Sequence, residues 1–235
     1  NIDFIIAGQQ LIEGKKFISS SFNFKLSKPN LSIKKENKIA ETILKAINIL
    51  FEKNYQITEY NINKIHKKFH LESEKLLPKG NYVGLSITQG NIYRKKEWPI
   101  DNIIKISNKL IESKKTPVFL IEKKNQDLKN KIKKLIPMAL FPEHESNIAS
   151  PALVTCLGKR LDFAITIDNG IMHMLSLAKV PMIALFGPTD SEKFAPEYKN
   201  SIILDSKKLH NTKDISAITV EDVLMAAKQH LNFSY

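Results

Sequence analysis

The sequence predicts an α/β fold built on a parallel sheet. From residue 81 onward, short apolar runs alternate with helix-like amphipathic segments, and small or polar residues follow most of the apolar runs. Strands separated by helices pair in parallel through right-handed crossovers. The clearest unit is FAITIDNGIMHMLSLAKVPMIALFGPT, residues 163–189, where polar residues gather at the junctions. We therefore expect residues 78–235 to form one complete Rossmann-like domain.

The elements of this domain follow in a regular order. Strands are expected at 82–88, 118–121, 138–141, 163–167, 182–186 and 201–204. Helices are expected from residue 100 to about 111, at 126–135, at 150–160, after Gly170, and from Val220 to Leu231. Pro99 sets the start of the first helix, and Asp101 in its first turn is favoured by the helix dipole.

Residues 1–77 have a different pattern of apolar and polar residues. This pattern predicts part of an N-terminal domain and a helical connection to the next domain. The apolar run from Ile2 to Ala7 predicts a strand. Apolar residues at helical spacing follow, at Ile39, Ile43, Ile47, Leu50 and Phe51 and again at Ile62, Ile65 and Phe69. Pro78-Lys79-Gly80 is typical of a linker, so we place the domain boundary there.

The hydrophobic content, the net charge and the number of arginines favour some classes of function over others. The chain has 235 residues, 43% of them hydrophobic, which is enough for a sizeable core. Its net charge is +12, yet only Arg94 and Arg160 among the 36 basic residues are arginines. Nucleic-acid readers favour arginine for its bidentate fork, so the lysine excess indicates compositional drift. Nucleic-acid binding is the least favoured alternative, and contact with acidic lipid head groups stays open as a secondary interpretation.

The remaining whole-chain features favour a cytoplasmic protein. No apolar run reaches the roughly 18 residues of a membrane-spanning helix, and the single cysteine, Cys156, lies among apolar residues typical of a core. The chain starts at Asn1, and no strand followed by a glycine turn opens it. We expect it to be a piece of a longer protein.

Two loops that follow expected strands contain candidate ligand-binding residues. Ligands of parallel α/β sheets bind outside the carboxyl ends of the strands. After the first strand comes Thr88-Gln89-Gly90-Asn91 and then Lys96, a combination suited to a diphosphate but equally compatible with an ordinary loop. In Asp168-Asn169-Gly170, the glycine is expected to permit the turn, and the N–H groups of Gly170 and Ile171 to face an anion. The alternative is a helix N-cap.

Other groups of polar residues give weaker evidence for a functional site. His66 and His70 have helical metal-ligand spacing but lack the accompanying carboxylate, so a solvated helix face is favoured. Glu143-His144-Glu145 is an acidic cluster whose alternatives are a metal site and, favoured, a cap on the strand end after Phe141. The chain contains no Asp-x-Asp, which argues against a diphosphate held through a divalent ion, and no Walker loop, nucleophile elbow or G-x-G-x-x-G. We expect no metal site and no cofactor.

Three motifs in register resemble the family 9 glycosyltransferases, typified by the ADP-heptose:lipopolysaccharide heptosyltransferases. They are Lys96-Glu97-Trp98-Pro99, Asp168-Asn169-Gly170-Ile171-Met172-His173 and Phe186-Gly187-Pro188-Thr189. The resemblance is strongest over residues 80–205. It implies a GT-B-type enzyme, of which this chain holds the Rossmann-like nucleotide-sugar-binding domain and part of the N-terminal, acceptor-side domain.

The resemblance also implies an activity. Family members transfer a sugar, by family default heptose, from a nucleotide-diphosphate sugar such as ADP-heptose to a lipopolysaccharide-core glycolipid, with inversion and without metal. Such an acceptor implies that the protein acts in the cytoplasm, at the inner face of the inner membrane. The resemblance assigns donor binding, by position, to Asn91, Lys96, Gln126, Asp168, Asn169, Gly170, Ile171 and His173.

The sequence departs from the family pattern in three places. Asn169 replaces the usual Ser or Thr, and Gln126 and Asp127 are only the nearest matches to the family's acidic residue near the nucleoside. The family's general base is a carboxylate in a glycine-rich segment near the start of the N-terminal domain, and that segment has no counterpart here. No catalytic base is therefore assigned, and a catalytically silent nucleotide-sugar-binding remnant is the alternative.

Overall fold

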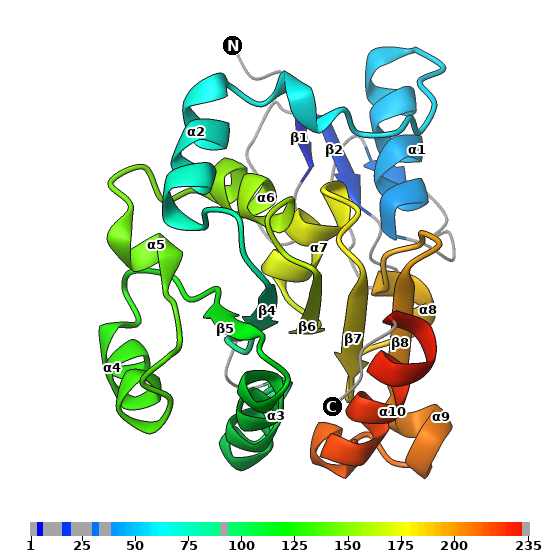
Figure 1. The fold of residues 1–235 in the computed structure, drawn as a ribbon. Coiled ribbons are helices and arrows are strands. Elements are labelled where there is room, and N and C mark those ends of the chain that lie inside the picture. Colours follow the sequence, from blue (N-terminus) through cyan, green and yellow to red (C-terminus); the bar gives the residue numbers. More distant parts are fainter. Residues whose placement is uncertain (1–3, 7–15, 20–29, 33–38, 90–93, 232–235) are drawn as a thin grey trace. The chain divides into compact units, whose positions relative to one another are not determined.

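The computed structural model describes residues 4–6, 16–19, 30–32, 39–89 and 94–231, shown in colour in Figure 1. By its contacts the chain divides into two compact units. The first comprises residues 1–59 and 192–194, and the second comprises residues 60–191 and 195–235. This division falls before the linker expected at Pro78, and the predicted domain boundary at residues 77 and 78 stays a prediction.

The first unit contains a parallel sheet in the order β1-β2-β3. Its strands are β1 (Phe4–Ile6), β2 (Lys16–Ser19) and β3 (Asn30–Ser32), and helix α1 (Ile39–Phe51) follows. β1 lies within the apolar run that predicted a strand, and α1 has the bounds set by the helical spacing. The Asn48 side chain holds the chain after α1, because it bonds both the N–H and the carbonyl of Tyr55.

The second unit is built on a five-stranded parallel sheet in the order β5-β4-β6-β7-β8. Its strands are β4 (Tyr82–Ser86), β5 (Thr116–Phe119), β6 (Phe163–Ile167), β7 (Met182–Phe186) and β8 (Ser201–Asp205). Every residue of β4, β6 and β7 is buried. Such burial is expected where helices cover both faces of a parallel sheet, and it explains the continuous apolar runs.

Helices alternate with these strands, and the described elements also include the 3-10 turns η1 and η3. They are η1 (Ile62–Lys64), α2 (Lys67–Leu76), α3 (Ile100–Glu112), α4 (Gln126–Leu135), α5 (Pro142–Glu145), α6 (Pro151–Gly158), α7 (Gly170–Leu177), α8 (Ser191–Phe194), α9 (Ser206–His210), η3 (Ile215–Ala217) and α10 (Val220–Leu231). Among the described helices, none has both the length and the apolar content needed to span a bilayer.

Two local expectations are confirmed and two are wrong. Pro99 is the N-cap of α3, and Cys156 is a buried core residue, 1% exposed. The strand expected at 138–141 is reduced to a single bridge between Leu140 and Val118. Glu143 does not cap a strand end in a loop but lies inside the short helix α5, because Pro142 starts a helical turn there.

Trp98 ties the start of α3 to the end of the chain. Its indole Nε1–H donates to the carbonyl oxygen of Ile218 at 2.8 Å, and the ring is 4% exposed. The loop that carries Lys96 is therefore anchored in the core immediately before α3 begins.

Candidate functional site

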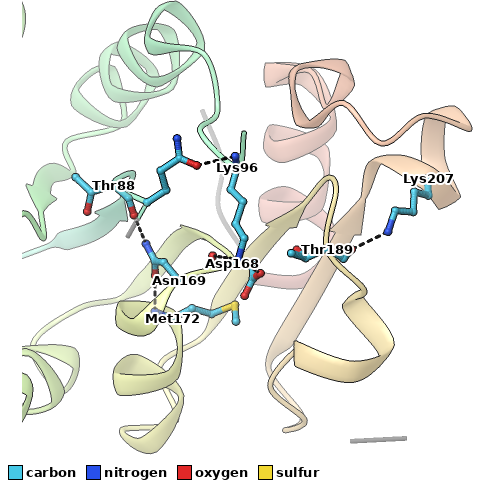
Figure 2. Close-up of polar contacts among 8 residues, drawn as sticks. Thr88, Lys96, Asp168, Asn169, Met172, Thr189 and Lys207 are labelled. Carbon is cyan, nitrogen blue, oxygen red and sulfur yellow. Dashed lines mark hydrogen bonds and ion pairs between the residues drawn. The ribbon is translucent and has the colours of Figure 1, made fainter. Parts of the chain in front are cut away.

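The carboxyl ends of the central strands bring the predicted junctions to one edge of the sheet. β4 pairs with β6, and β6 pairs with β7, so the loops after these strands are neighbours. Figure 2 shows the polar contacts among residues of these loops. The sequence placed Lys96 and Asp168 in two loops at the carboxyl ends of strands, where ligands of parallel sheets bind.

Lys96 and Asp168 form a nearly buried ion pair. The Lys96 ammonium donates to the Asp168 carboxylate and also to the Asp168 carbonyl oxygen, at 3.2 Å from Nζ. The side chains are 11% and 9% exposed, respectively. The Lys96 backbone N–H donates to Oε1 of Gln89 at 2.9 Å, which fixes the loop that carries the lysine. The pair thus holds a cation in a fixed position at the edge of the sheet.

The side-chain amide of Asn169 makes its hydrogen bonds to other groups of the protein. Its Oδ1 accepts the Met172 N–H at 3.0 Å and so caps α7. Its Nδ2 donates to Ser86 Oγ at 2.7 Å and to the Thr88 carbonyl at 2.9 Å. The N-cap alternative therefore describes Asn169, whose amide also joins the end of β6 to the end of β4 (Figure 2).

The first turn of α7 leaves N–H groups that the helix itself cannot pair. Gly170 and Ile171 open this turn, as predicted. Gly170 has no left-handed φ, and among the described residues a Cβ added there would meet only Met174 Cε, at 3.9 Å. The expectation that Gly170 permits the turn is therefore wrong, because any residue could adopt this backbone. What the glycine provides is open space beside the helix start.

His173 lies one turn into α7 and senses both charges of the ion pair. The residue is exposed, yet its imidazole is partly desolvated, which lowers the pKa of His173 below its usual value. Asp168 opposes this shift and Lys96 adds to it. The ring is consequently neutral at neutral pH and able to donate one hydrogen bond.

A pocket of about 200 Å³ lies beside the start of α7. It is lined by residues that follow three strands, namely Thr88, Gln89, Glu122, Lys124, Asn125, Asn169, Gly170, Ile171 and Met174. Glu122 and Lys124 form an ion pair with each other. Sequence reasoning named Thr88 and Gln89 in the loop after the first strand but missed Glu122, Lys124, Asn125 and Met174 as lining residues.

Among the described donor-binding candidates, Asn169, Gly170 and Ile171 line this pocket, whereas Lys96, Gln126, Asp168 and His173 do not. Gln126 is exposed at the start of α4, and its side chain bonds Asn130 at 2.9 Å and His144 at 3.1 Å instead of lining the pocket. Asn91 lies outside the described residues. Within the described part of the chain, no three His, Cys, Asp or Glu side chains gather as a candidate metal site.

The family model of glycosyltransferase family 9 (heptosyltransferase) matches residues 16–224. The chain belongs to glycosyltransferase family 9. This match confirms the resemblance inferred from the three motifs. Comparison with curated proteins gave no match.

Solved structures agree on the fold of this family 9 chain. A family 9 glycosyl transferase from Veillonella parvula DSM 2008 matches 94% of the chain, with a TM-score of 0.71 and 18% identity. E. coli heptosyltransferase WaaC with ADP-2-deoxy-2-fluoro heptose matches 85%, with a TM-score of 0.60 and 16% identity. E. coli ADP-heptose lps heptosyltransferase II matches 72%, with a TM-score of 0.58 and 16% identity. The predicted α/β class is confirmed, and the match to GT-B heptosyltransferases covers part of their length.

The chain spans 67%, 58% and 53% of the lengths of these three structures, in the order given. Within this family 9 chain the motifs have distinct structural places. Lys96 and Asp168 pair at the sheet edge, Trp98 anchors the first loop in the core, and Gly187 packs against Ile215.

Proposed function

We propose that the chain is the donor-binding part of a glycosyltransferase that moves a sugar from a nucleotide-diphosphate sugar to a cell-envelope glycolipid. The observation that carries this proposal is the nearly buried Lys96 cation, which Asp168 holds just before the start of α7, where the pocket lies. Family membership supports the reaction class.

The chemistry follows from charge. When the acceptor hydroxyl attacks the anomeric carbon, the bond to the diphosphate breaks and negative charge develops on the leaving oxygen. A lysine and the unpaired N–H groups of a helix start stabilise such charge in a fixed geometry. Lys96 and the first turn of α7 would supply this stabilisation without a metal. Asp168 keeps the lysine in place and offers carboxylate oxygens to sugar hydroxyls.

The pocket suits the nucleoside end of the donor. Glu122 offers a carboxylate to ribose hydroxyls, and the amides of Gln89 and Asn125 offer donors and acceptors to ribose or base. WaaC is described with ADP and with ADP-2-deoxy-2-fluoro heptose, which supports an adenosine-diphosphate donor and heptose as the sugar. Transfer to a glycolipid would place the protein at the inner face of the inner membrane, with no nucleic acid as partner.

Nucleotide protection tests the proposal. ADP at 100 times its Kd stabilises a protein by about 2.7 kcal/mol, which raises the Tm of a domain of this size by roughly 5–10 °C. Lys96→Ala and Asp168→Ala should each abolish the shift, because each removes one partner of the ion pair. Lys105→Ala, which removes an exposed lysine of α3, should keep it. Absence of a shift with any nucleoside diphosphate would contradict the proposal.

A silent donor-binding module is the second candidate. Among the described residues, both carboxylates of the site, Asp168 and Glu122, are paired with lysines, so neither is poised as a general base. The two candidates differ in one measurement. A transferase converts an ADP-sugar and a lipid-linked acceptor into glycosylated lipid and ADP, whereas a silent module in the full-length gene product binds the donor and releases no ADP.

A further inference from the structure

The loop after β7 is fixed on one side by direct backbone packing. A Cβ added to Gly187 would lie 2.7 Å from Ile215 Cβ and 2.9 Å from Ile215 N. Real contacts of this kind are never so short, so only glycine lets the loop approach η3 this closely. The backbone that leads to Thr189 consequently has a defined path.

A lysine holds the same loop at its far end. Lys207 Nζ donates to the carbonyl oxygen of Thr189 at 2.8 Å, as Figure 2 shows. Lys207 is itself held, because its backbone N–H donates to buried Asp205 at 2.9 Å. Ser191 Oγ donates to the same carboxylate at 2.5 Å. The carbonyl of Thr189 is thus tied to a connected polar network.

The hydroxyl of Thr189 is the part that this network leaves out. Its Oγ1 is shielded from solvent and has no hydrogen-bond partner among the described residues. A buried hydroxyl without a partner calls for an explanation, since most buried polar atoms are paired. The fold around Thr189 pairs its carbonyl and supplies nothing for its hydroxyl.

The strand order says which end of a donor lies nearest to Thr189. Pocket-lining residues follow β4, β5 and β6, whereas Thr189 follows β7, on the other side of β6. In strand order, the loop after β6 that carries Asp168, the partner of Lys96, lies between the loop after β4 and the loop after β7 that carries Thr189. A diphosphate at Lys96 therefore separates a nucleoside in the pocket from a sugar near Thr189.

We propose that Thr189 is a specificity-determining residue whose hydroxyl bonds the transferred sugar of the donor, and that Lys207 is the positioning residue that holds it. This inference rests on the proposed function. A neutral hydroxyl, which both donates and accepts, matches a sugar hydroxyl.

Two ligands separate the sugar contact from the rest of the site. The full chain and its variants are titrated by calorimetry with ADP and with ADP-2-deoxy-2-fluoro heptose. Thr189→Val should bind ADP within twofold of the unmodified chain but the sugar nucleotide about threefold to tenfold more weakly, the worth of one neutral hydrogen bond. Thr189→Ser, which keeps the hydroxyl, should retain most of the affinity. Lys207→Met should weaken only the sugar nucleotide, because its effect passes through Thr189.

The outcomes are distinguishable. An unchanged affinity ratio in Thr189→Val, or an equal loss for both ligands, overturns the role of Thr189 while nucleotide binding by the unmodified chain still stands. Failure of the unmodified chain to bind either ligand overturns the proposed function itself. A Tm of Thr189→Val equal to that of the unmodified chain shows that its loss of affinity is not misfolding.

Discussion

Glu143 should make the stability of the second unit depend on pH in an unusual direction. The residue is 6% exposed in α5, and its Oε1 has no hydrogen-bond partner among the described residues. Burial, reinforced by the charge of Glu122, raises the pKa of Glu143 from 4.5 to about 7. The folded protein therefore favours the protonated acid, which is neutral and avoids the penalty of a buried charge.

Proton linkage gives the sign and the size of the change in the free energy of unfolding with pH. Below the unfolded pKa of 4.5, both states carry the proton and the burial of Glu143 is not penalised. Between pH 4.5 and about 7 the unfolded state loses its proton first, so stability falls as pH rises. At 1.36 kcal/mol per pKa unit the full loss is about 3 kcal/mol, and between pH 5 and pH 8 it is about 2–3 kcal/mol.

Urea unfolding at pH 5, 6, 7 and 8 measures this loss. Glu143→Gln cannot ionise, so its free energy of unfolding should fall by about 2–3 kcal/mol less than that of the unmodified chain between pH 5 and pH 8. Glu145→Gln is the matched control, because Glu145 is an exposed neighbour in the same helix. Parallel pH profiles for the unmodified chain and Glu143→Gln would refute the reasoning.

Two further predictions compare matched positions. Lys114 ends α3 in the left-handed region with φ 57°, so Lys114→Gly should raise the free energy of unfolding by about 0.5–1 kcal/mol. Lys105→Gly inside α3 should lower it by about 1 kcal/mol, and thermal or urea denaturation reports both. Gly187→Ala should cost about 1–3 kcal/mol, because its Cβ would collide with Ile215. Gly170→Ala should leave stability within about 0.5 kcal/mol but weaken ADP binding in calorimetry, since it fills open space by the pocket; the reverse pattern for the two glycines would contradict this account.

Much of the fold was predictable because the signals are local. β6 and β7 have the predicted bounds, since their apolar runs are closed by Asp168 and Gly187. α4 likewise has the predicted bounds, because its helical pattern depends only on residues close together in the sequence. The strand expected at 138–141 is reduced to one bridge at Leu140, because α5 begins at Pro142 directly after this short apolar run.

The site was predictable only in part. Lys96 and Asp168 could each be placed in a loop after a strand of one parallel sheet, because the strand pattern is local; their contact depends on the strand order. The direction of the loop after β5 could not be predicted, so Gln126 was favoured over Glu122, Lys124 and Asn125. Nor does the sequence show that the Asn169 amide makes three internal hydrogen bonds, because two of its partners lie more than 80 residues away in the chain.

The sequence by itself determined the family and the alternation of strands and helices, through three short motifs and through apolar periodicity. Only the tertiary structure decided which side chains share a site. Lys96 and Asp168 stand 72 residues apart, and they pair because the sheet places β4 beside β6 rather than in chain order. Local patterns select the type of each element, whereas the burial of both sheet faces selects its neighbours, and those neighbours build the site.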